Sequence, residues 1–313
     1  MPYVVYSLDS AIERFFAGAG VASSRAECDD IARRSYTVVA GPHRDRIVQF
    51  REQAALLDAK VVALAKDMHV ELVPRCSEIG RVGGENGPQL VIYEMEKVPG
   101  DNCVTARFNL APEKRVNIVI SLARFFAQAW KKGVAERQPV DIVRLHSECC
   151  ARLDYLAGTL PMRFLPVVAK VQATLPQWFK DDSYPVVLTH ADLNEMNILI
   201  DPSSGDITGI VDWSEASMQP FGFALYALDN ALGTMSNDGW RWYDHAEAMR
   251  ESFWDVFQAE IGSLSASQLE LVKLAETAGI LIRYGTAYDS GFSGLVGVRD
   301  TNGDDFGFLD ALL

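Results

Sequence analysis

The sequence predicts an α+β fold in which a small antiparallel sheet comes first and a larger, mainly helical part follows. Short stretches rich in β-branched and aromatic residues, separated by turn residues, occur in the first hundred positions. From Pro112 onward, apolar residues recur instead at the spacing of amphipathic helices. Strand-like sequence returns only over 185–213. We therefore expect one lobe over residues 1–97 and a second over residues 98–313.

The elements of the first lobe follow from alternating strand and turn signals. Residues 35–39 and 47–51 are rich in Val, Ile, Tyr, Phe and Thr, and the Gly-Pro and Asp of 41–45 predict a hairpin turn between them. Apolar residues at helical spacing predict a helix over 54–68. The apolar run 89–95, which precedes a Pro-Gly pair, predicts another strand.

Two long apolar stripes predict the main helices of the second lobe. One stripe comprises Val119, Leu122, Phe126 and Trp130, and the other comprises Ile142, Leu145, Cys149, Leu153 and Leu156. Each stripe recurs every three to four residues, so each is expected to bury one face of its helix.

Composition excludes several classes of protein. The chain has 313 residues, 49% of them hydrophobic and 23% charged, which is typical of a globular protein and not of a disordered or fibrous one. The longest stretch without a charged residue, 216–228, is shorter than the roughly 18 apolar residues that a membrane-spanning helix needs. A net charge of −13 repels nucleic-acid phosphates and anionic lipids. We expect neither nucleic acid nor membrane as a partner.

Cysteine usage and the amino terminus favour a cytoplasmic location. The five cysteines are odd in number and include no CxxC pair, which favours buried reduced thiols over disulfides or a zinc site. Residues 1–16 carry Asp9, Glu13 and Arg14 among their apolar residues, unlike a secretory signal peptide.

Polar residues with chemical potential gather within 185–213. A buried-type strand over 186–189 ends at His190 and Asp192, and Asn197 opens a second strand. After the turn residues 201–206, a third strand returns to Asp212. We therefore expect a loop followed by a β-hairpin.

The hairpin register brings these side chains together. If Ile200 faces Ile207 or Thr208, Asn197 lies opposite Ile210 or Val211, beside Asp212. The loop then adds Asp192. Carboxylate and amide oxygens suit Mg²⁺, which takes its other ligands from water and phosphates.

This grouping predicts phosphoryl transfer. Asp192 would orient and deprotonate a hydroxyl, while Asn197 and Asp212 would hold the metal. Because Asp and Asn also favour turns, a purely structural role stays open for Asp192 and Asn197.

The segment His190-Ala191-Asp192 with Asn197, followed by Ile210-Val211-Asp212-Trp213, resembles the Brenner-type motif of aminoglycoside phosphotransferases and choline kinases. The resemblance extends over most of the chain and is greatest to a fungal subset with a phosphotransferase-family domain. It implies a bilobal protein-kinase-like fold, with a small antiparallel-sheet N-lobe that binds nucleotide and a larger, mainly helical C-lobe that carries the catalytic loop and the acceptor pocket. It also implies ATP and Mg²⁺ as cofactors.

The resemblance further implies roles for residues of the N-lobe. Ser35 and Tyr36 would lie at the loop over the nucleotide phosphates. Arg51 would stand where the family has a cation on its third strand, with Asp58 as its acidic partner on the following helix. The hinge that meets adenine would comprise Glu94, Met95 and Glu96.

The sequence departs from the family pattern at two places. No glycine-rich loop precedes Ser35, and an arginine takes the place of the expected lysine. Arginine can clamp phosphates bidentately but is not interchangeable with lysine, and Arg51 could instead be a surface residue of its strand.

Together these features predict an ATP- and Mg²⁺-dependent enzyme that moves the γ-phosphate to a hydroxyl of a small molecule. A hydroxyl is favoured over an amine because a carboxylate of ordinary pKa cannot deprotonate an ammonium ion. Acidic residues at 229, 247 and 255 leave a cationic acceptor open. The alternatives are a catalytically inactive kinase-fold binding protein and nucleotidyl transfer on the same fold. The acceptor's identity and the oligomeric state do not follow from the sequence.

Overall fold

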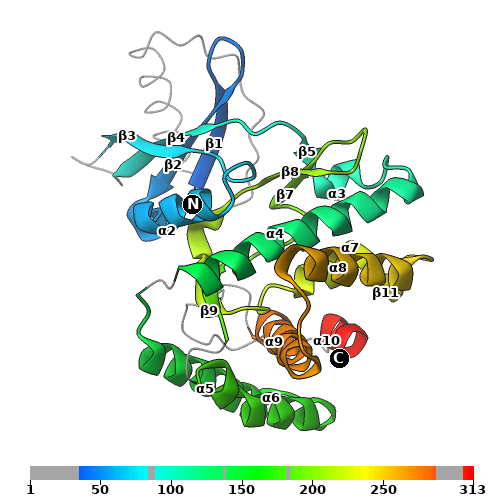
Figure 1. The fold of residues 1–313 in the computed structure, drawn as a ribbon. Coiled ribbons are helices and arrows are strands. Elements are labelled where there is room, and N and C mark those ends of the chain that lie inside the picture. The colour runs from blue at the N-terminus through cyan, green and yellow to red at the C-terminus, as the bar shows by residue number, and fades with distance from the viewer. Residues whose placement is uncertain (1–34, 84–88, 137–138, 181–183, 287–305) are drawn as a thin grey trace.

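The computed structural model describes residues 35–83, 89–136, 139–180, 184–286 and 306–313. It is an α+β structure with an antiparallel sheet region followed by a larger helical part, as predicted (Figure 1). None of the helices within these ranges is long and apolar enough to cross a membrane.

The N-terminal sheet has four antiparallel strands in the order β1-β2-β4-β3. Their bounds are Ser35–Ala40 for β1, Arg46–Glu52 for β2, Cys76–Val82 for β3 and Leu90–Glu96 for β4. Strands β1 and β2 form the predicted hairpin, whose turn contains Gly41 at a positive φ of 89°. The backbone N–H of Arg44 donates to the carbonyl of Gly41 at 3.0 Å and closes this turn.

The helix between β2 and β3 begins later than the apolar pattern indicates. A 3-10 turn, η1 (Gln53–Ala55), precedes α2 (Ala59–Met68). Asp58 caps α2, because its carboxylate accepts from the backbone N–H groups of Lys60 and Val61. The cap stops the helix from extending back to residue 54.

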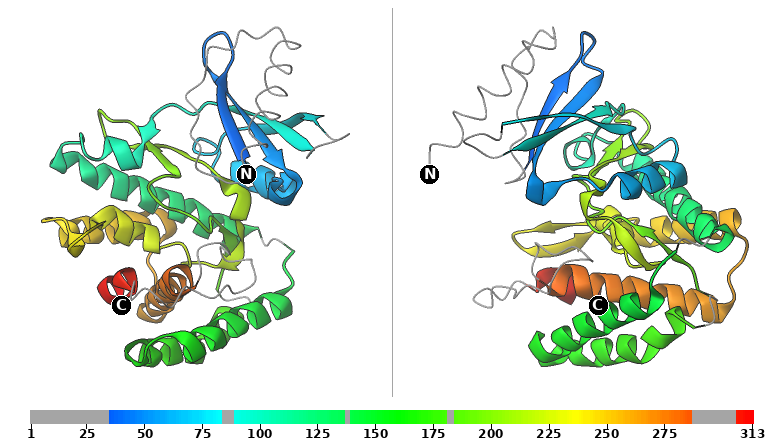
Figure 2. Two further views of the ribbon diagram at one scale, coloured as in Figure 1. Left: turned by 180° about the vertical axis from the view of Figure 1, so that it is seen from behind. Right: turned by 90° about the vertical axis from the view of Figure 1, so that its left-hand side faces the viewer.

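The C-terminal part contains the remaining helices of the described chain. They are α3 (Cys103–Ala106), α4 (Arg115–Ala135), α5 (Ile142–Thr159), α6 (Leu165–Trp178), α7 (Tyr226–Leu232), α8 (Ala246–Ile261), α9 (Ala266–Gly285) and α10 (Gly307–Leu312), with 3-10 turns η2 (Pro112–Lys114), η3 (Met162–Phe164) and η4 (Trp213–Glu215). Helices α4 and α5 carry the two predicted apolar stripes. Figure 2 shows α5 and α6 farthest from the N-terminal sheet, with α9 between them and α4.

Short strands position the polar loop among these helices. Strand β6 (Val186–Thr189) pairs with β9 (Ser217–Pro220), and β5 (Asp101–Asn102), β7 (Ile198–Ile200) and β8 (Ile207–Ile210) form a second sheet. A separate hairpin consists of β10 (Gly233–Ser236) and β11 (Gly239–Trp242). In the β7–β8 pair, Ile200 faces Ile207, as in one predicted register, but the register shifts between Leu199 and Ile200. Ile198 therefore faces Ile210, as in the other predicted register.

The buried apolar side chains form two clusters. A small one belongs to the N-terminal sheet and includes Val48, Phe50 and Ile92. The larger one fills the helical part and extends to Ala65 and Met68 of α2. Helix α2 therefore packs on the core of the C-terminal part and connects the sheet region to it.

Candidate active site

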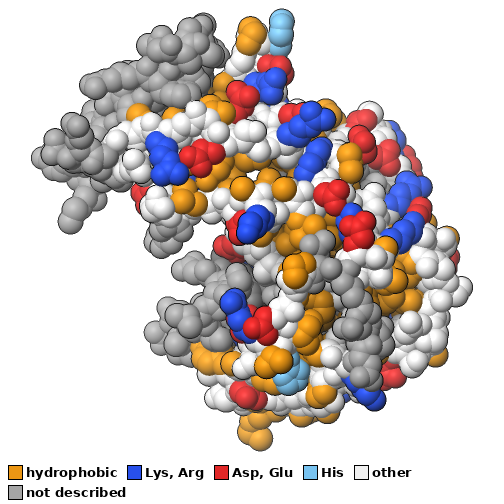
Figure 3. Space-filling model, turned by 60° about the vertical axis from the view of Figure 1, so that its left-hand side comes forward, with side chains coloured by type: hydrophobic (Ala, Val, Ile, Leu, Met, Phe, Trp, Pro, Cys, Tyr) orange, Lys and Arg blue, Asp and Glu red, His pale blue; other side chains and the backbone are white. Residues whose placement is uncertain are grey.

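A cleft of about 340 Å³ lies between the sheet region and the helical part. Figure 3 shows the molecule hollowed between these two parts. From the sheet, Thr37, Gln49 and Arg51 line the cleft, and from the β7–β8 hairpin and the residues after it, Leu199 and Asp212 do so. Arg51, the cation expected to bind phosphates, and Asp212, one of the two expected metal ligands, therefore line the same cleft.

His190 ties the polar loop to the end of strand β8. Its Nδ1 accepts from the backbone N–H of Asp192 at 3.2 Å, so Nε2 carries the proton that is donated to the carbonyl of Val211 at 2.9 Å. The ring is buried and packs edge-on against Trp213, with centroids 4.9 Å apart. Burial lowers the pKa of His190, which keeps the imidazole neutral while it makes these two hydrogen bonds. His190 thus fixes the backbone around the loop.

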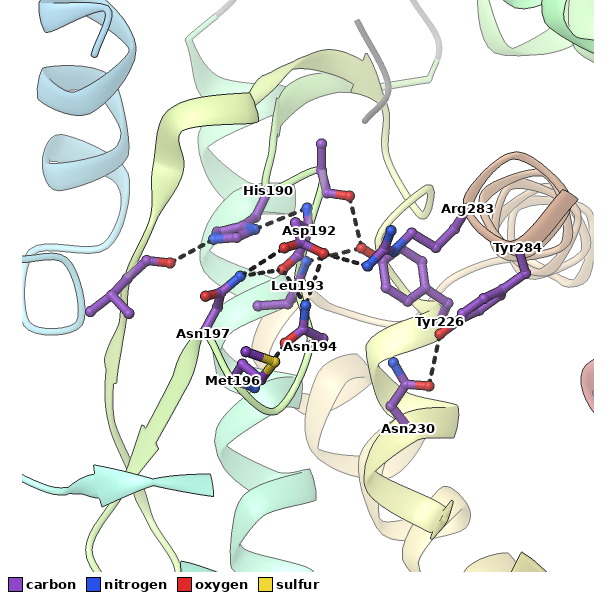
Figure 4. A network of polar contacts seen from close by, with 12 residues as sticks. His190, Asp192, Leu193, Asn194, Met196, Asn197, Tyr226, Asn230, Arg283 and Tyr284 are labelled. Carbon is purple, nitrogen blue, oxygen red and sulfur yellow. Dashed lines mark hydrogen bonds and ion pairs between the residues drawn. The ribbon is translucent and has the colours of Figure 1, made fainter. Parts of the chain in front are cut away.

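The carboxylate of Asp192 is held by donors from three residues (Figure 4). Its Oδ1 accepts from Nδ2 of Asn194 at 2.8 Å and forms an ion pair with Arg283. Its Oδ2 accepts from Nδ2 of Asn197 at 3.1 Å. About 27% of the Asp192 side chain stays exposed, so the group is oriented yet reachable.

Asn197 and Asp212 lie side by side, as the predicted register requires. The backbone N–H of Val211 donates to the carbonyl of Asn197 at 2.9 Å, directly before Asp212 in the chain. Asp212 has left-handed backbone angles, φ 60° and ψ 64°, a conformation that few non-glycine residues adopt. This turn ends strand β8 and begins the 3-10 turn η4.

The charge environment of Asp212 keeps its carboxylate ionised. Its Oδ1 accepts from Nη2 of Arg51 at 3.1 Å and from the hydroxyl of Ser214 at 2.8 Å. Desolvation raises the pKa of Asp212, but the charge of Arg51 and the hydrogen bonds from Arg51 and Ser214 outweigh it and hold the pKa below its usual value.

The donor chemistry of this pair fits Mg²⁺. The Asn197 amide uses Nδ2 to bind Asp192, which leaves its oxygen as a ligand, and among the described residues no donor occupies Oδ2 of Asp212. The same residues contain no group of three or more His, Cys, Asp or Glu side chains that could hold a metal ion. Two oxygen ligands suit an ion that takes its remaining ligands from water and phosphates.

Arg51 is buried on the cleft face of β2 and uses all three of its nitrogens. Besides the bond to Asp212, Nε donates to the side-chain oxygen of Gln49 at 3.0 Å and Nη1 to the carbonyl of Ala55 at 3.2 Å. Its carboxylate partner is therefore Asp212. The expected partner, Asp58, instead caps helix α2, because an aspartate directly before a helix satisfies the first free N–H groups.

Ser35 and Tyr36 belong to strand β1 and not to a loop. The register places Ser35 opposite Arg51, on the face that lines the cleft through Thr37. Tyr36 has the opposite orientation, since successive side chains of a strand alternate between faces. Its ring packs 6.3 Å from that of Phe50 in the small sheet cluster, so its expected contact with nucleotide phosphates has no support in this geometry.

The three expected hinge residues end strand β4. Met95 and Glu96 line the cleft, whereas Glu94 lies 3.6 Å from Arg46 in an exposed ion pair. The backbone N–H of Glu96 donates to Arg75. Two of the three expected hinge residues therefore lie at the cleft, and Glu94 does not.

Helices α7 and α9 add residues that the sequence did not assign to the site. The hydroxyl of Tyr226 accepts from the N–H of Leu193 at 3.0 Å and donates to the carbonyl of Ala191 at 3.1 Å, on either side of Asp192. Arg283 of α9 reaches Asp192 itself. The sequence signal that could have indicated this role is the position of Arg283 directly after the apolar run 278–282.

Comparison with known proteins identifies the family. The model of the phosphotransferase enzyme family matches residues 29–241, about two thirds of the chain. The chain belongs to the phosphotransferase enzyme family. This confirms the resemblance seen in the motif around Asp192. A search of curated proteins found no match.

Solved structures of phosphotransferases share the fold of this family member. An aminoglycoside 2'-phosphotransferase of type IIIa in complex with GDP has a TM-score of 0.56 at 15% identity, with 89% of each chain covered. Macrolide 2'-phosphotransferase MphH from Brachybacterium faecium has a TM-score of 0.55 at 14% identity and covers 90% of this chain and 91% of its own.

A third structure is aminoglycoside phosphotransferase APH(3'')-Id from Streptomyces rimosus in complex with ADP and streptomycin. Its TM-score is 0.53 at 13% identity, with 85% of this chain and 95% of its own covered. At these identities the similarity establishes the bilobal kinase-like fold.

Proposed function

We propose that this family member transfers the γ-phosphate of ATP, with Mg²⁺, to a hydroxyl group of a small molecule. The observation that carries the proposal is a connected group of four residues at one cleft. Arg51 and Asp212 line the cleft, the residue before Asp212 bonds to Asn197, and Asn197 bonds to the carboxylate of Asp192. Phosphoryl transfer requires a base for the acceptor hydroxyl, oxygen ligands for the metal ion and a positive charge that binds the phosphates.

Each residue has a distinct proposed role. Asp192 orients the acceptor hydroxyl and takes its proton, while Asn197 and Asp212 hold Mg²⁺ through side-chain oxygens. The bound ion would neutralise negative charge on the phosphates. Arg51, which already pairs with Asp212, would extend its positive charge to the same phosphates.

The nucleotide base would bind at the end of strand β4. Met95 offers an apolar surface, and the next residues, Lys97 and Val98, also line the cleft. The N–H of Lys97 donates to the carbonyl of Asp45, whereas that of Val98 has no hydrogen-bond partner within the described part of the chain. Val98 is thus the proposed hinge donor. Because the similar structures include complexes with ADP and with GDP, both ATP and GTP belong in the assay.

The acceptor pocket would lie in the helical part, next to Asp192. Asp229, one of the acids considered for a cationic acceptor, is buried and pairs with Arg250 at 2.7 Å. Glu195 likewise pairs with Arg107. Since these carboxylates already have cationic partners, the acceptor panel should include neutral and anionic alcohols as well as cationic compounds such as the streptomycin and kanamycin bound in similar structures.

Two further expectations are kept as proposals. Two observations support a lobe boundary after residue 97. Strand β4 ends at Glu96, and the residues that follow it, Lys97 and Val98, line the cleft between the two parts. A cytoplasmic location is supported by the described cysteines, which are all free thiols.

The proposal is tested by incubating the protein with Mg²⁺, ATP or GTP, and the acceptor panel. Mass spectrometry of the products should show an acceptor heavier by one phosphate. Addition of a nucleotide would instead support nucleotidyl transfer. Calorimetry completes the test, because nucleotide binding without any turnover would support the inactive binding protein and contradict the proposed function.

A further inference from the structure

Arg283 is the most distant residue in sequence that contacts the carboxylate of Asp192. It lies near the end of α9, 91 positions after Asp192, whereas the other two donors belong to the loop itself. The Arg283 side chain is only 8% exposed. Since charged side chains are rarely buried without a partner, the ion pair with Asp192 helps to explain why this arginine can be buried.

The hydrogen bonds divide the two oxygens of Asp192 unequally. Oδ1 accepts from Asn194 and pairs with Arg283, so its two lone pairs are used. Oδ2 accepts from Asn197, the one donor that the described residues give it, and keeps one lone pair. The oxygen that can receive a proton from an acceptor is therefore Oδ2. Arg283 contributes to this assignment by occupying Oδ1.

The helix that carries Arg283 is firmly placed. Tyr284, the next residue, donates from its hydroxyl to the side-chain oxygen of Asn230 at 2.9 Å, and its ring stacks on that of Phe308 at 4.6 Å. One turn earlier, Gly279 lies so close to Phe223 that an added Cβ would be 1.9 Å from its carbonyl oxygen. This contact fixes α9 against the segment before α7, so the guanidinium starts from a rigid position.

We propose that Arg283 is a positioning residue for the base: it holds the Asp192 carboxylate in the rotation that presents Oδ2 to the acceptor hydroxyl. The inference rests on the proposed function. It extends that function by giving α9 a direct part in orienting the base. Orientation of a reacting group is worth one to several factors of ten in rate, because a base turned away from its proton donor must first be reoriented.

A second arginine pair on the same loop provides a matched control. Arg107 pairs with Glu195, three residues after Asp192, and these side chains are 16% and 24% exposed. Both arginines thus connect the loop to a neighbouring helix, but Arg107 pairs with a carboxylate that has no assigned role. A loss of loop stability alone should affect both variants, whereas a loss of base orientation should affect only Arg283.

The experiment compares wild type with Arg283→Met, Arg283→Lys and Arg107→Met. Turnover is measured with the best acceptor from the panel, or with water as acceptor through nucleotide hydrolysis. Nucleotide binding is measured by calorimetry and folding by thermal melting. For Arg283→Met we expect kcat to fall by about ten- to a hundredfold while KM for the nucleotide changes less than about threefold. Added guanidinium at millimolar concentration should restore part of kcat.

The two other variants separate orientation from folding. Arg107→Met should keep kcat within about threefold of wild type. Arg283→Lys, which keeps the charge but not the planar fork, should give an intermediate kcat. If Arg283→Met does not fold, Arg283→Lys decides alone: a reduced kcat at unchanged KM supports the proposal, and wild-type kcat overturns it.

Each remaining outcome also decides. Active wild type together with a fully active or faster Arg283→Met overturns the role of Arg283 and leaves the proposed function in place. Equal losses in Arg283→Met and Arg107→Met, without rescue by guanidinium, also overturn it, because they indicate loop stability only. A wild-type protein that binds nucleotide but turns over neither an acceptor nor water overturns the proposed function and, with it, the role of Arg283.

Discussion

Replacement of Arg51 by lysine, the residue expected from the family pattern, should destabilise this protein although the charge is retained. The guanidinium donates to Gln49, Ala55 and Asp212 at 3.0, 3.2 and 3.1 Å. A lysine has one nitrogen at the end of a flexible chain and cannot reach all three acceptors. Arg51→Lys should therefore lose two of these bonds.

The magnitude follows from burial. The Arg51 side chain is 6% exposed, so water does not replace the lost donors. Hydrogen bonds from charged groups contribute about 1.5 to 3 kcal/mol each, so we expect the free energy of unfolding to fall by about 2 to 4 kcal/mol after partial relaxation. Nucleotide affinity should fall less than about tenfold, because the positive charge next to Asp212 remains.

Urea denaturation and calorimetry with Mg²⁺ and ATP test both parts. Arg46→Lys is the control on the same strand, since Arg46 is 47% exposed and its ion pairs with Asp45 and Glu94 are long, 3.9 and 3.6 Å. It should change stability by less than about 0.5 kcal/mol. Arg51→Met should lose more than about tenfold in nucleotide affinity. Wild-type stability of Arg51→Lys, or wild-type affinity of Arg51→Met, would refute this reasoning.

Four further substitutions test packing and buried charge. Burial lowers the pKa of His69 to about 4, so the imidazole stays neutral in the folded state while the unfolded state gains a proton below pH 6.5. The wild-type protein should therefore lose stability as pH falls from 6.5 to 4. His69→Phe should lose less over the same range, as measured by urea denaturation. Burial raises the pKa of Glu276 to about 8, so ionisation of this carboxyl opposes folding as pH rises from 4.5 to 8. Glu276→Gln should therefore have a higher melting temperature than wild type at pH 8 and no such gain at pH 4.5. Gly279→Ala should lower the melting temperature strongly, because the new Cβ would clash with the carbonyl oxygen of Phe223. Gly158→Ala in α5 should raise it slightly, because nothing lies within 4 Å of the new Cβ and alanine favours the helix.

The polar loop and the β7–β8 hairpin were predictable because their contacts are local. Asn197 and Asp212 are joined by a hairpin whose turn residues and alternating apolar residues leave few registers. Their approach to each other could therefore be predicted from a short stretch of sequence, and the family motif added the chemistry.

Contacts between distant segments were not predictable in the same way. Arg283 meets Asp192 only because α9 packs against the segment before α7, which no local pattern encodes. The pairing of Arg51 with Asp212 joins β2 to the end of β8 and likewise depends on how the two parts of the molecule meet.

Two expectations rested on the resemblance and not on local rules. Asp58 directly precedes a helical stripe, the position of an N-cap, and that role explains its carboxylate without Arg51. Tyr36 alternates with Thr37 along β1, so the two cannot both face the cleft.

The most direct test of the central claim is the turnover of Asp192→Asn, measured alongside its binding of Mg²⁺ and ATP. Asparagine preserves the size of the side chain but cannot accept the hydroxyl proton at neutral pH. We predict that kcat falls by at least about a hundredfold while the affinity for the nucleotide stays within about threefold of wild type. Turnover equal to that of wild type, in a variant that binds ATP normally, would contradict the assignment of Asp192 as the base.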